Sequence, residues 1–471
     1  MSYDQARWTH EDGETYEPLL AEKRSTEVEV DSSLPDDLTR ENLTLSEQSE
    51  PELARHYTRL SQMNYGVENG PFPLGSCTMK YNPTFTEDVA ALSGAAIHPD
   101  RPDETRQGSL EVRYRLQEQL AAIGGMHSVT LQPPAGAAGE FTGISVAKAY
   151  HEENDDPRSE IIVPESAHGT NFASAALAGY DVVSLPSAED GRVDVEALRA
   201  AVSEETAALM LTNPNTLGLF ERDIEEIAEI VHDAGGLLYY DGANLNALLG
   251  RARPGDMGFD VMHYNVHKTF ATPHGGGGPG AGPVGVVEDL APFLPTPQVR
   301  ETESGFETVE PERTIGKVHG FAGNWLVLIK TYAYIARLGD TGLSDASAKA
   351  ILNANYPASQ IDYEIPFSPF HHEFVASADR DAADVARRML DYGVHPPTTK
   401  WPEIVPEALM TEPTESETRD SLDALARAFD RAAEDSDEEL DTAPERTTAR
   451  RIDQASAARD PQLSWQALSE E

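Results

Sequence analysis

Short apolar runs alternate with longer stretches of helical spacing through the middle of the chain. The apolar, β-branched runs predict strands at 128–131, 161–163, 182–185, 207–212, 237–240 and 261–266. Between them, apolar residues three and four positions apart predict helices that end near 151 or span 171–178, 195–202 and 224–234. Strands that alternate with helices favour a parallel sheet covered on both faces. We therefore expect an α/β fold with a large, doubly wound, mainly parallel sheet.

The pattern changes on both sides of this central region. The first 60 residues are polar and punctuated by prolines; they have room for a short helix or two but show no strand pattern, which is typical of an arm that wraps a neighbouring subunit. Residues 64–98 have the composition of a loop, and an apolar helix at 325–338 leads into a stretch of mixed helix and strand pattern. We predict an N-terminal arm, a large domain, a smaller C-terminal α+β domain and a charged tail, which cover 1–60, 61–330, 331–450 and 451–471.

The composition narrows the classes of partner. The chain has 471 residues with 81 acidic and 36 basic side chains, and its formal net charge is −45. So acidic a chain repels the phosphates of nucleic acids and lacks the basic clusters that anionic membranes attract. The acidic residues are spread along the chain, and molar salt would screen their mutual repulsion. We therefore expect a halophilic protein that binds neither nucleic acid nor membrane.

The cellular compartment follows from cysteine usage and from the N-terminal sequence. Cys77 is the single cysteine, so no internal disulfide can form, as is usual in a reducing cytoplasm. No apolar stretch follows a basic N-terminal region, and no apolar run approaches the length of a membrane span. The sequence therefore predicts a soluble, cytoplasmic protein.

Residues 260–282 carry the strongest candidate chemistry. The apolar run that begins at Val261 leads directly into His267 and Lys268, and a glycine-rich loop follows. A lysine at the end of a strand over such a loop suits a ligand that approaches the backbone closely. Burial lowers a lysine pKa, and the neutral amine can form a Schiff base with an aldehyde cofactor. Pyridoxal phosphate is the cofactor that this arrangement favours.

Three other interpretations of this stretch exist. Lys268 could be a structural lysine that donates hydrogen bonds to strand-end carbonyls, and the glycines could form a flexible linker. Residues 280–285 also fit the dinucleotide fingerprint G-x-G-x-x-G. We reject that match because a long loop precedes it, and because the Val284 segment that follows predicts a strand and not a helix.

Polar or glycine-rich segments follow five of the predicted strands. Ligands bind at the carboxyl ends of the strands in a doubly wound sheet, so these segments should meet at one site. The glycine-rich segment 136–139 precedes a helix N-terminus, where free N–H groups and the helix dipole suit a phosphate. The other strand ends carry candidate polar side chains, namely His168, Thr216, Asp241, Asn244 and Lys268.

Several of these residues also have plainer interpretations. Asp241 could cap the N-terminus of a following helix, and His168 could be an ordinary loop histidine. Cys77 is more simply a small buried apolar side chain. The adjacent histidines His371 and His372 suggest a metal site. However, neighbouring side chains on a strand point to opposite faces, and no H-E-x-x-H or C-x-x-C motif occurs. We predict no metal site.

Long motifs, dispersed along the chain, resemble the glycine cleavage system P-protein family, and more narrowly the second-subunit branch of its two-subunit form. The similarity runs from about residue 57 to 451. It includes PLGSCTMKYNP at 73–83, SAHGTN at 166–171, LTNPNTLG at 211–218, YDGANLNA at 240–247, HKTF at 267–270 and PHGGGGPG at 273–280.

The resemblance implies fold type I pyridoxal-phosphate catalysis. Lys268 would hold the cofactor as a Schiff base, Asp241 would pair with the ring nitrogen and His168 would stack on the ring. Gly136 and Ala137 would bind the phosphate, with Asn244 and Thr216 near the ring. Glycine would lose CO₂, and its aminomethyl group would pass to the lipoyl arm of the H-protein. The implied assembly is α2β2 with a first subunit of similar fold that lacks the lysine.

Two other functions remain open from the sequence. The chain could be another fold type I enzyme, such as an amino-acid decarboxylase or a desulfurase with a different substrate. It could also be a scaffold subunit without activity, although the presence of both Lys268 and Asp241 argues against that.

Overall fold

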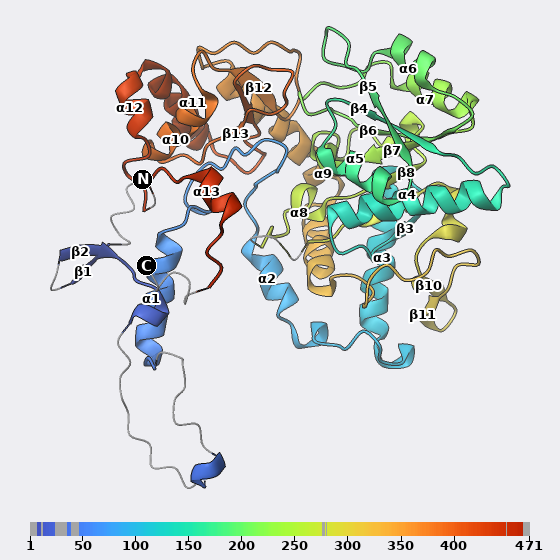
Figure 1. The fold of residues 1–471 in the computed structure, drawn as a ribbon. Coiled ribbons are helices and arrows are strands. Elements are labelled where there is room, and N and C mark those ends of the chain that lie inside the picture. Colours follow the sequence, from blue (N-terminus) through green and yellow to red (C-terminus); the bar gives the residue numbers. More distant parts are fainter. Residues whose placement is uncertain are drawn as a thin grey trace.

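The computed structural model describes residues 7–10, 13–23, 35–38, 47–275, 278, 280–448 and 450–464 (Figure 1). The central feature is a seven-stranded sheet of order β3-β9-β8-β7-β6-β4-β5. β4–β8 run parallel to one another, and only β9 is antiparallel to its two neighbours. Its strands are β3 (Ser128–Thr130), β4 (Glu160–Pro164), β5 (Asp181–Leu185), β6 (Thr206–Thr212), β7 (Leu237–Asp241), β8 (Val261–His263) and β9 (Val284–Val286).

Helices cover both faces of this sheet. Successive side chains of strand β6 point to opposite faces of the sheet, and both sets are apolar. Leu209 and Leu211 pack into the core on one face, and Ala208 and Met210 pack into the core on the other. One face packs against α3 (Gln107–Gly124), α6 (Val195–Ala201), α7 (Ile224–Asp233) and the start of α9 (Trp325–Ala358). The other face packs against α4 (Gly136–Glu153) and α5 (Gly169–Leu177). The predicted doubly wound, mainly parallel α/β fold is confirmed.

The C-terminal part has its own small sheet and core. Helix α9 carries a break at Gly339, whose φ is +58°, so the predicted helix at 325–338 is the part before the break. Beyond α9, a three-stranded sheet of order β12-β14-β13 packs against two helices, α10 (Ala382–Asp391) and α11 (Arg419–Glu434). The strands are β12 (Phe374–Ser377), β13 (Thr398–Thr399) and β14 (Ala408–Thr411), and two short helices follow, α12 (Asp437–Thr442) and α13 (Gln454–Arg459).

Two expectations about the local structure were wrong. The arm, where no strand was expected, contains a β-hairpin, β1 (Arg7–His10) with β2 (Gly13–Tyr16). Helix α1 (Glu50–Gln62) agrees with the short helix expected in the arm. The stretch expected to be loop contains α2 (Thr84–Ala90), which packs on α9. A second hairpin, β10 (Gln298–Thr302) with β11 (Gly305–Val309), lies in a stretch for which no element was predicted. Two-stranded hairpins carry only short apolar patterns, so their sequences predict little.

Candidate active site

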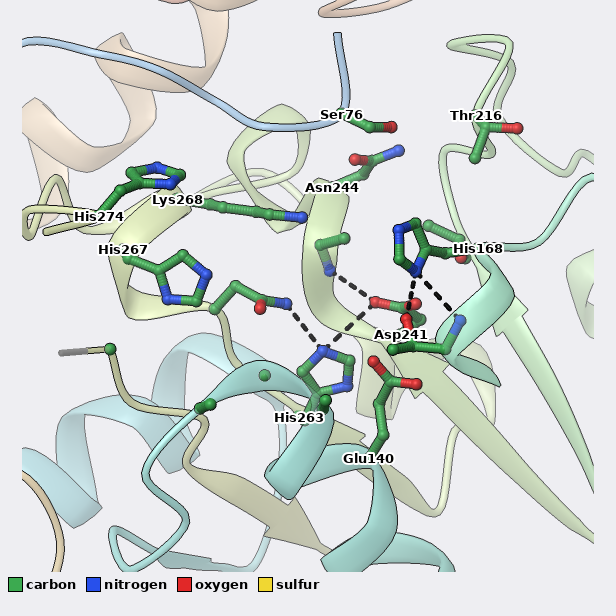
Figure 2. Close-up of a pocket in the computed structure, with 18 of the residues that line it drawn as sticks. Ser76, Glu140, His168, Thr216, Asp241, Asn244, His263, His267, Lys268 and His274 are labelled. Atoms are coloured by element: carbon green, nitrogen blue, oxygen red, sulfur yellow. Dashed lines mark hydrogen bonds and ion pairs between the residues drawn. The ribbon is translucent and has the colours of Figure 1, made fainter. Parts of the chain in front are cut away.

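A cavity of about 370 Å³ opens at the carboxyl ends of β4, β6, β7 and β8 (Figure 2). The structure brings to this single cavity all seven residues singled out from the sequence, which are Lys268, Asp241, His168, Gly136, Ala137, Asn244 and Thr216. The convergence follows from topology, because parallel strands present their carboxyl ends along one edge of a sheet. What each residue does there stays a prediction.

Lys268 does not lie at the end of a strand, as the apolar run to Val266 predicted. Strand β8 stops at His263, and Lys268 sits in a single helical turn, α8 (Val266–Thr269). Figure 2 shows its side chain extending into the cavity toward Asn244. Its Nζ makes no hydrogen bond or ion pair with any described residue, so the amine is available to a ligand. Part of the predicted glycine-rich floor, residues 276–277 and 279, lies outside the described residues.

Asp241 ends β7 and is 2% exposed on the floor of the cavity. One carboxylate oxygen accepts from the Ala243 N–H at 2.9 Å, so the residue also caps the turn that follows, and the other accepts from Asn171 Nδ2 at 3.0 Å. Burial by itself would raise the pKa of this carboxyl. The charges of His263 and Lys268, together with these hydrogen bonds, outweigh burial and hold the pKa of Asp241 below its usual value. The floor therefore carries a fixed negative charge.

A chain of hydrogen bonds supports this carboxylate from behind. His263 Nε2 lies 3.4 Å from Asp241 Oδ1 and 2.7 Å from Asn265 Nδ2, and its Nδ1 lies 2.9 Å from the Tyr239 hydroxyl. Glu140 shares the Asn171 amide with Asp241 and accepts from it at 2.8 Å. Burial, and then the charge of Asp241, raise the pKa of Glu140 to about 8. One carboxyl of the pair is thus ionised and the other holds its proton at neutral pH.

Replacing Glu140 by glutamine should stabilise the cofactor-free protein at alkaline pH. Folding raises the pKa of this carboxyl from 4.5 to about 8. The free energy of unfolding therefore falls as the pH rises between these two values. The glutamine oxygen can still accept from Asn171. We expect no difference near pH 4.5 and a gain of up to about 5 kcal/mol above pH 8, measured by denaturant unfolding. Glu225→Gln, on the exposed face of α7, serves as the control, and equal pH profiles for both variants would contradict the assignment.

The N-terminus of α4 forms another wall of the cavity. Gly136 and Ala137 are its first two residues, and their N–H groups have no partner among the described residues. No side chain caps this end of the eighteen-residue helix, so the unpaired N–H groups and the helix dipole suit a phosphate. A Cβ on Gly136 would overlap Asn265 Oδ1, which explains the glycine: the helix begins against the segment that leads to Lys268.

The predicted polar residues on the remaining walls are already held by the protein. His168 caps the N-terminus of α5, where its Nδ1 accepts from the Thr170 N–H at 3.2 Å. Thr216 Oγ1 donates to the Ser166 carbonyl at 2.7 Å. The buried Asn244 donates to the Pro214 carbonyl at 2.9 Å. These bonds fix the side chains before a ligand arrives, which reduces the entropy lost on binding.

Gly242 sets the position of Asp241. It lies directly after β7, and a Cβ there would overlap the backbone carbonyl of His263. The Gly242→Ala variant is therefore expected to lose about 2–4 kcal/mol of unfolding free energy, because backbone must move to admit the methyl group. Gly108→Ala in α3, where a Cβ meets nothing within 4 Å, should leave stability unchanged or raise it slightly. Denaturant melts compare the two, and equal stabilities would refute the close approach.

The roof of the cavity comes from parts of the chain that the sequence did not connect. Ser76 and Thr78 have positive φ angles of 59° and 49°, which are unfavourable for residues with a Cβ. Their N–H groups are held at 2.9 Å by the buried carboxyls of Glu373 and Glu412. Both acids lie in the C-terminal part, about 300 residues further along the chain. No local pattern indicates such a pair, although both acids lie within the stretch from about residue 57 to 451 over which the family resemblance extends.

Two groups of buried acidic and histidine side chains could accept a metal ion geometrically. They are Glu140 with Asp241 and His263, and His372 with Glu373 and Glu412. The carboxyl oxygens of both groups already accept the hydrogen bonds described above. His267 and His274 also line the cavity, and burial lowers the pKa of both, that of His267 to about 3, so both rings are neutral. The cavity therefore offers neutral rings around a lysine and a carboxylate.

Comparisons with known proteins agree with this geometry. Residues 346–450 match the family model of the glycine dehydrogenase C-terminal domain, and residues 138–278 match the aminotransferase class-V model. A protein of Halobacterium salinarum named "probable glycine dehydrogenase (decarboxylating) subunit 2" is 71% identical over 99% of both chains. A protein of the same name from Thermoplasma volcanium is 52% identical over 95% of this chain and 98% of its own.

Solved structures share the fold at lower identity. A glycine decarboxylase (P-protein) of the glycine cleavage system, in inhibitor-bound form, superposes with a TM-score of 0.73 at 23% identity, over 85% of this chain and 93% of its own. The cysteine desulfurase CsdA of Escherichia coli superposes with a TM-score of 0.59 at 20% identity, over 82% of this chain and 99% of its own.

The doubly wound sheet, with a lysine and a buried aspartate at one cavity, defines an α/β protein of the pyridoxal-phosphate-dependent aminotransferase class. The identity to the relatives extends over nearly the whole chain and includes both family-model regions. The chain belongs to the family of glycine dehydrogenase (decarboxylating) subunit 2 proteins.

Proposed function

We propose that this protein decarboxylates glycine with pyridoxal phosphate and transfers the aminomethyl group to the lipoyl arm of the H-protein. The observation that carries the proposal is the single cavity in which Lys268 and the ionised Asp241 meet, in a chain 71% identical to a glycine dehydrogenase (decarboxylating) subunit 2. Pyridoxal phosphate, when bound, supplies a ring that accepts the electrons of a bond broken at the substrate Cα.

Different residues of the cavity would hold different parts of pyridoxal phosphate. Lys268 provides the amine that attaches its aldehyde carbon, and the N–H groups of Gly136 and Ala137 bind its phosphate. The carboxylate of Asp241 would keep a proton on the ring nitrogen, and His168 would stack against the ring. Asn244 and Thr216 line the side of the cavity nearest the roof. The donor set therefore fits the cofactor: an amine, an anion site and a carboxylate face one space.

The partners of the chain are part of the same proposal. The relatives are named as a second subunit, which supports a first subunit of similar fold and an α2β2 assembly. No helix in the described part of the chain is both long and apolar enough to cross a membrane. We propose that the protein works in the cytoplasm, where glycine and lipoylated H-protein are its substrates.

The salt of that cytoplasm also enters the proposal. The net charge of −45 and the relative from Halobacterium salinarum support a halophilic enzyme. Molar potassium chloride shortens the Debye length to about 3 Å and screens the repulsion between acidic side chains. Thermal melts and activity should both improve from low salt to molar salt. A protein that is as stable and active in dilute buffer would refute this part of the proposal.

Exchange of labelled bicarbonate into the glycine carboxyl group tests the activity. The chain, purified with its candidate first subunit in molar salt, should catalyse exchange with glycine, and lipoylated H-protein should increase the rate. H-protein without the lipoyl group is the matched control. Exchange with another amino acid and none with glycine would instead indicate a different enzyme of the same fold.

A further inference from the structure

Lys80 is a second lysine buried beside the cavity, and its exposed fraction is only 2%. Its Nζ donates to Glu415 Oε1 at 2.6 Å, to the Thr269 carbonyl at 2.7 Å and to Asn246 Oδ1 at 3.0 Å. An ammonium group has three N–H donors, so this set satisfies all of them. Burial by itself lowers a lysine pKa, but the carboxylate of Glu415 outweighs it and keeps the pKa of Lys80 above its usual value.

Two of the three partners of Lys80 come from segments that line the cavity. Thr269 ends α8, and its carbonyl lies one residue beyond Lys268. Asn246 belongs to the turn Gly242–Ala247, which begins directly after Asp241, and its Nδ2 donates to Glu415 Oε2 at 3.1 Å. Glu415 itself follows β14 in the C-terminal part. The Lys80 ammonium group thus bonds both the turn that carries Lys268 and the turn that follows Asp241.

The turn that carries Lys268 has little support of its own. Helix α8 spans four residues, too few for its own hydrogen bonds to hold it in a fixed orientation. A positive charge at the carbonyl end of a helix is favourable, and here it also fixes the Thr269 carbonyl in space. Asn82, two residues after Lys80, donates from its Nδ2 to the Ala271 carbonyl at 3.0 Å and so holds the chain just after the α8 turn.

We propose that Lys80, held by Glu415, is a positioning residue that orients the α8 turn so that the Lys268 amine points into the cavity. The proposal rests on the assignment of Lys268 as the cofactor lysine. A buried ion pair contributes little net stability compared with apolar residues of similar size, because both charges lose their water. We therefore assign this pair a role in geometry, because three polar partners from different segments accept hydrogen bonds from one cation.

The test uses the full chain with three variants. Lys80→Met removes the cation at similar volume, and Glu415→Gln keeps a hydrogen-bond acceptor without the charge. The control is Lys330→Met, because the Lys330–Glu87 pair has the same 2.6 Å separation but is more exposed, at 14% and 57%. It joins α9 to α2 and touches no residue of the cavity wall.

Two readouts separate positioning from general destabilisation. In the cofactor-free chain, amide hydrogen exchange at residues 266–272 should accelerate about ten- to a hundredfold in Lys80→Met, and less in Glu415→Gln, while the core strands stay protected. With pyridoxal phosphate added, borohydride should trap correspondingly less cofactor on Lys268 at limiting concentration. Lys330→Met should match the unsubstituted chain in both.

Each result decides a separate claim. Unchanged exchange at 266–272 together with unchanged trapping in Lys80→Met would overturn the positioning role. If Lys80→Met fails to fold, Glu415→Gln decides by the same two measurements. Failure of the unsubstituted chain to be trapped at Lys268 would overturn the proposed function instead, while the exchange experiment would still report whether Lys80 orients the turn.

Discussion

Replacing Lys268 by alanine is expected to abolish visible absorbance from bound pyridoxal phosphate and to reduce glycine–bicarbonate exchange by roughly 10⁴-fold or more, as for the loss of a covalent nucleophile. The reason is chemical, because no other described lysine lines the cavity. Lys80, which bonds the carbonyl of the residue after Lys268, has all its donors occupied by protein groups. Absorbance spectra, together with the exchange assay, measure both effects.

The control for this prediction is Lys317→Ala, which removes an exposed lysine outside the cavity and should change neither reading. Borohydride reduction followed by peptide mass spectrometry locates the cofactor directly. An adduct on any lysine other than Lys268, or full exchange activity in Lys268→Ala, would exclude the proposed role.

Asp241→Asn is expected to retain the cofactor on Lys268 but to lower the exchange rate by about 10²- to 10⁴-fold. The substitution keeps the shape of the side chain and removes the negative charge that holds a proton on the ring nitrogen. An asparagine oxygen can still accept from Ala243 or from Asn171, so the fold should persist. The cofactor spectrum and the rate, measured on one preparation, separate binding from chemistry.

Asp260→Asn is the matched control. Asp260 also accepts a backbone N–H, that of Leu238 at 2.7 Å, but it lies before β8, at the opposite end of the strands from the cavity. It should affect stability and not the rate per bound cofactor. An Asp241→Asn enzyme that exchanges bicarbonate at the normal rate would show that the charge on the floor is not needed.

The sequence was sufficient to predict the central sheet and one side of the site. Strands such as β6 are buried on both faces, so their apolar runs are continuous and easily recognised. Residues at or shortly after the carboxyl ends of such strands, including Asp241 and His168, must then meet at one edge of the sheet. The position of Lys268 was predicted from the same rule, although the intervening Tyr264 and Asn265 turn the chain into a helix first.

The roof of the site could not be derived in the same way. Ser76, Lys80 and their partners Glu373 and Glu415 lie about 300 residues apart in the chain, and hydrogen bonds across that distance leave no periodic pattern. The acids look like ordinary surface carboxylates in a chain with 81 acidic residues. Only their burial in the folded protein distinguishes them from the others.

The roof of the cavity is built from two distant parts of the chain, and this limits which segments can be exchanged between related enzymes. The region that matches the aminotransferase class-V model, 138–278, contains most of the cavity wall but neither the loop before α2 nor the acids that hold it. A chimaera that joins this region to the flanking segments of a distant relative would contain the cavity floor but not the roof residues that fit it. Interchangeable parts in this family must therefore include the loop at 74–82 and the segment at 372–415 as a set.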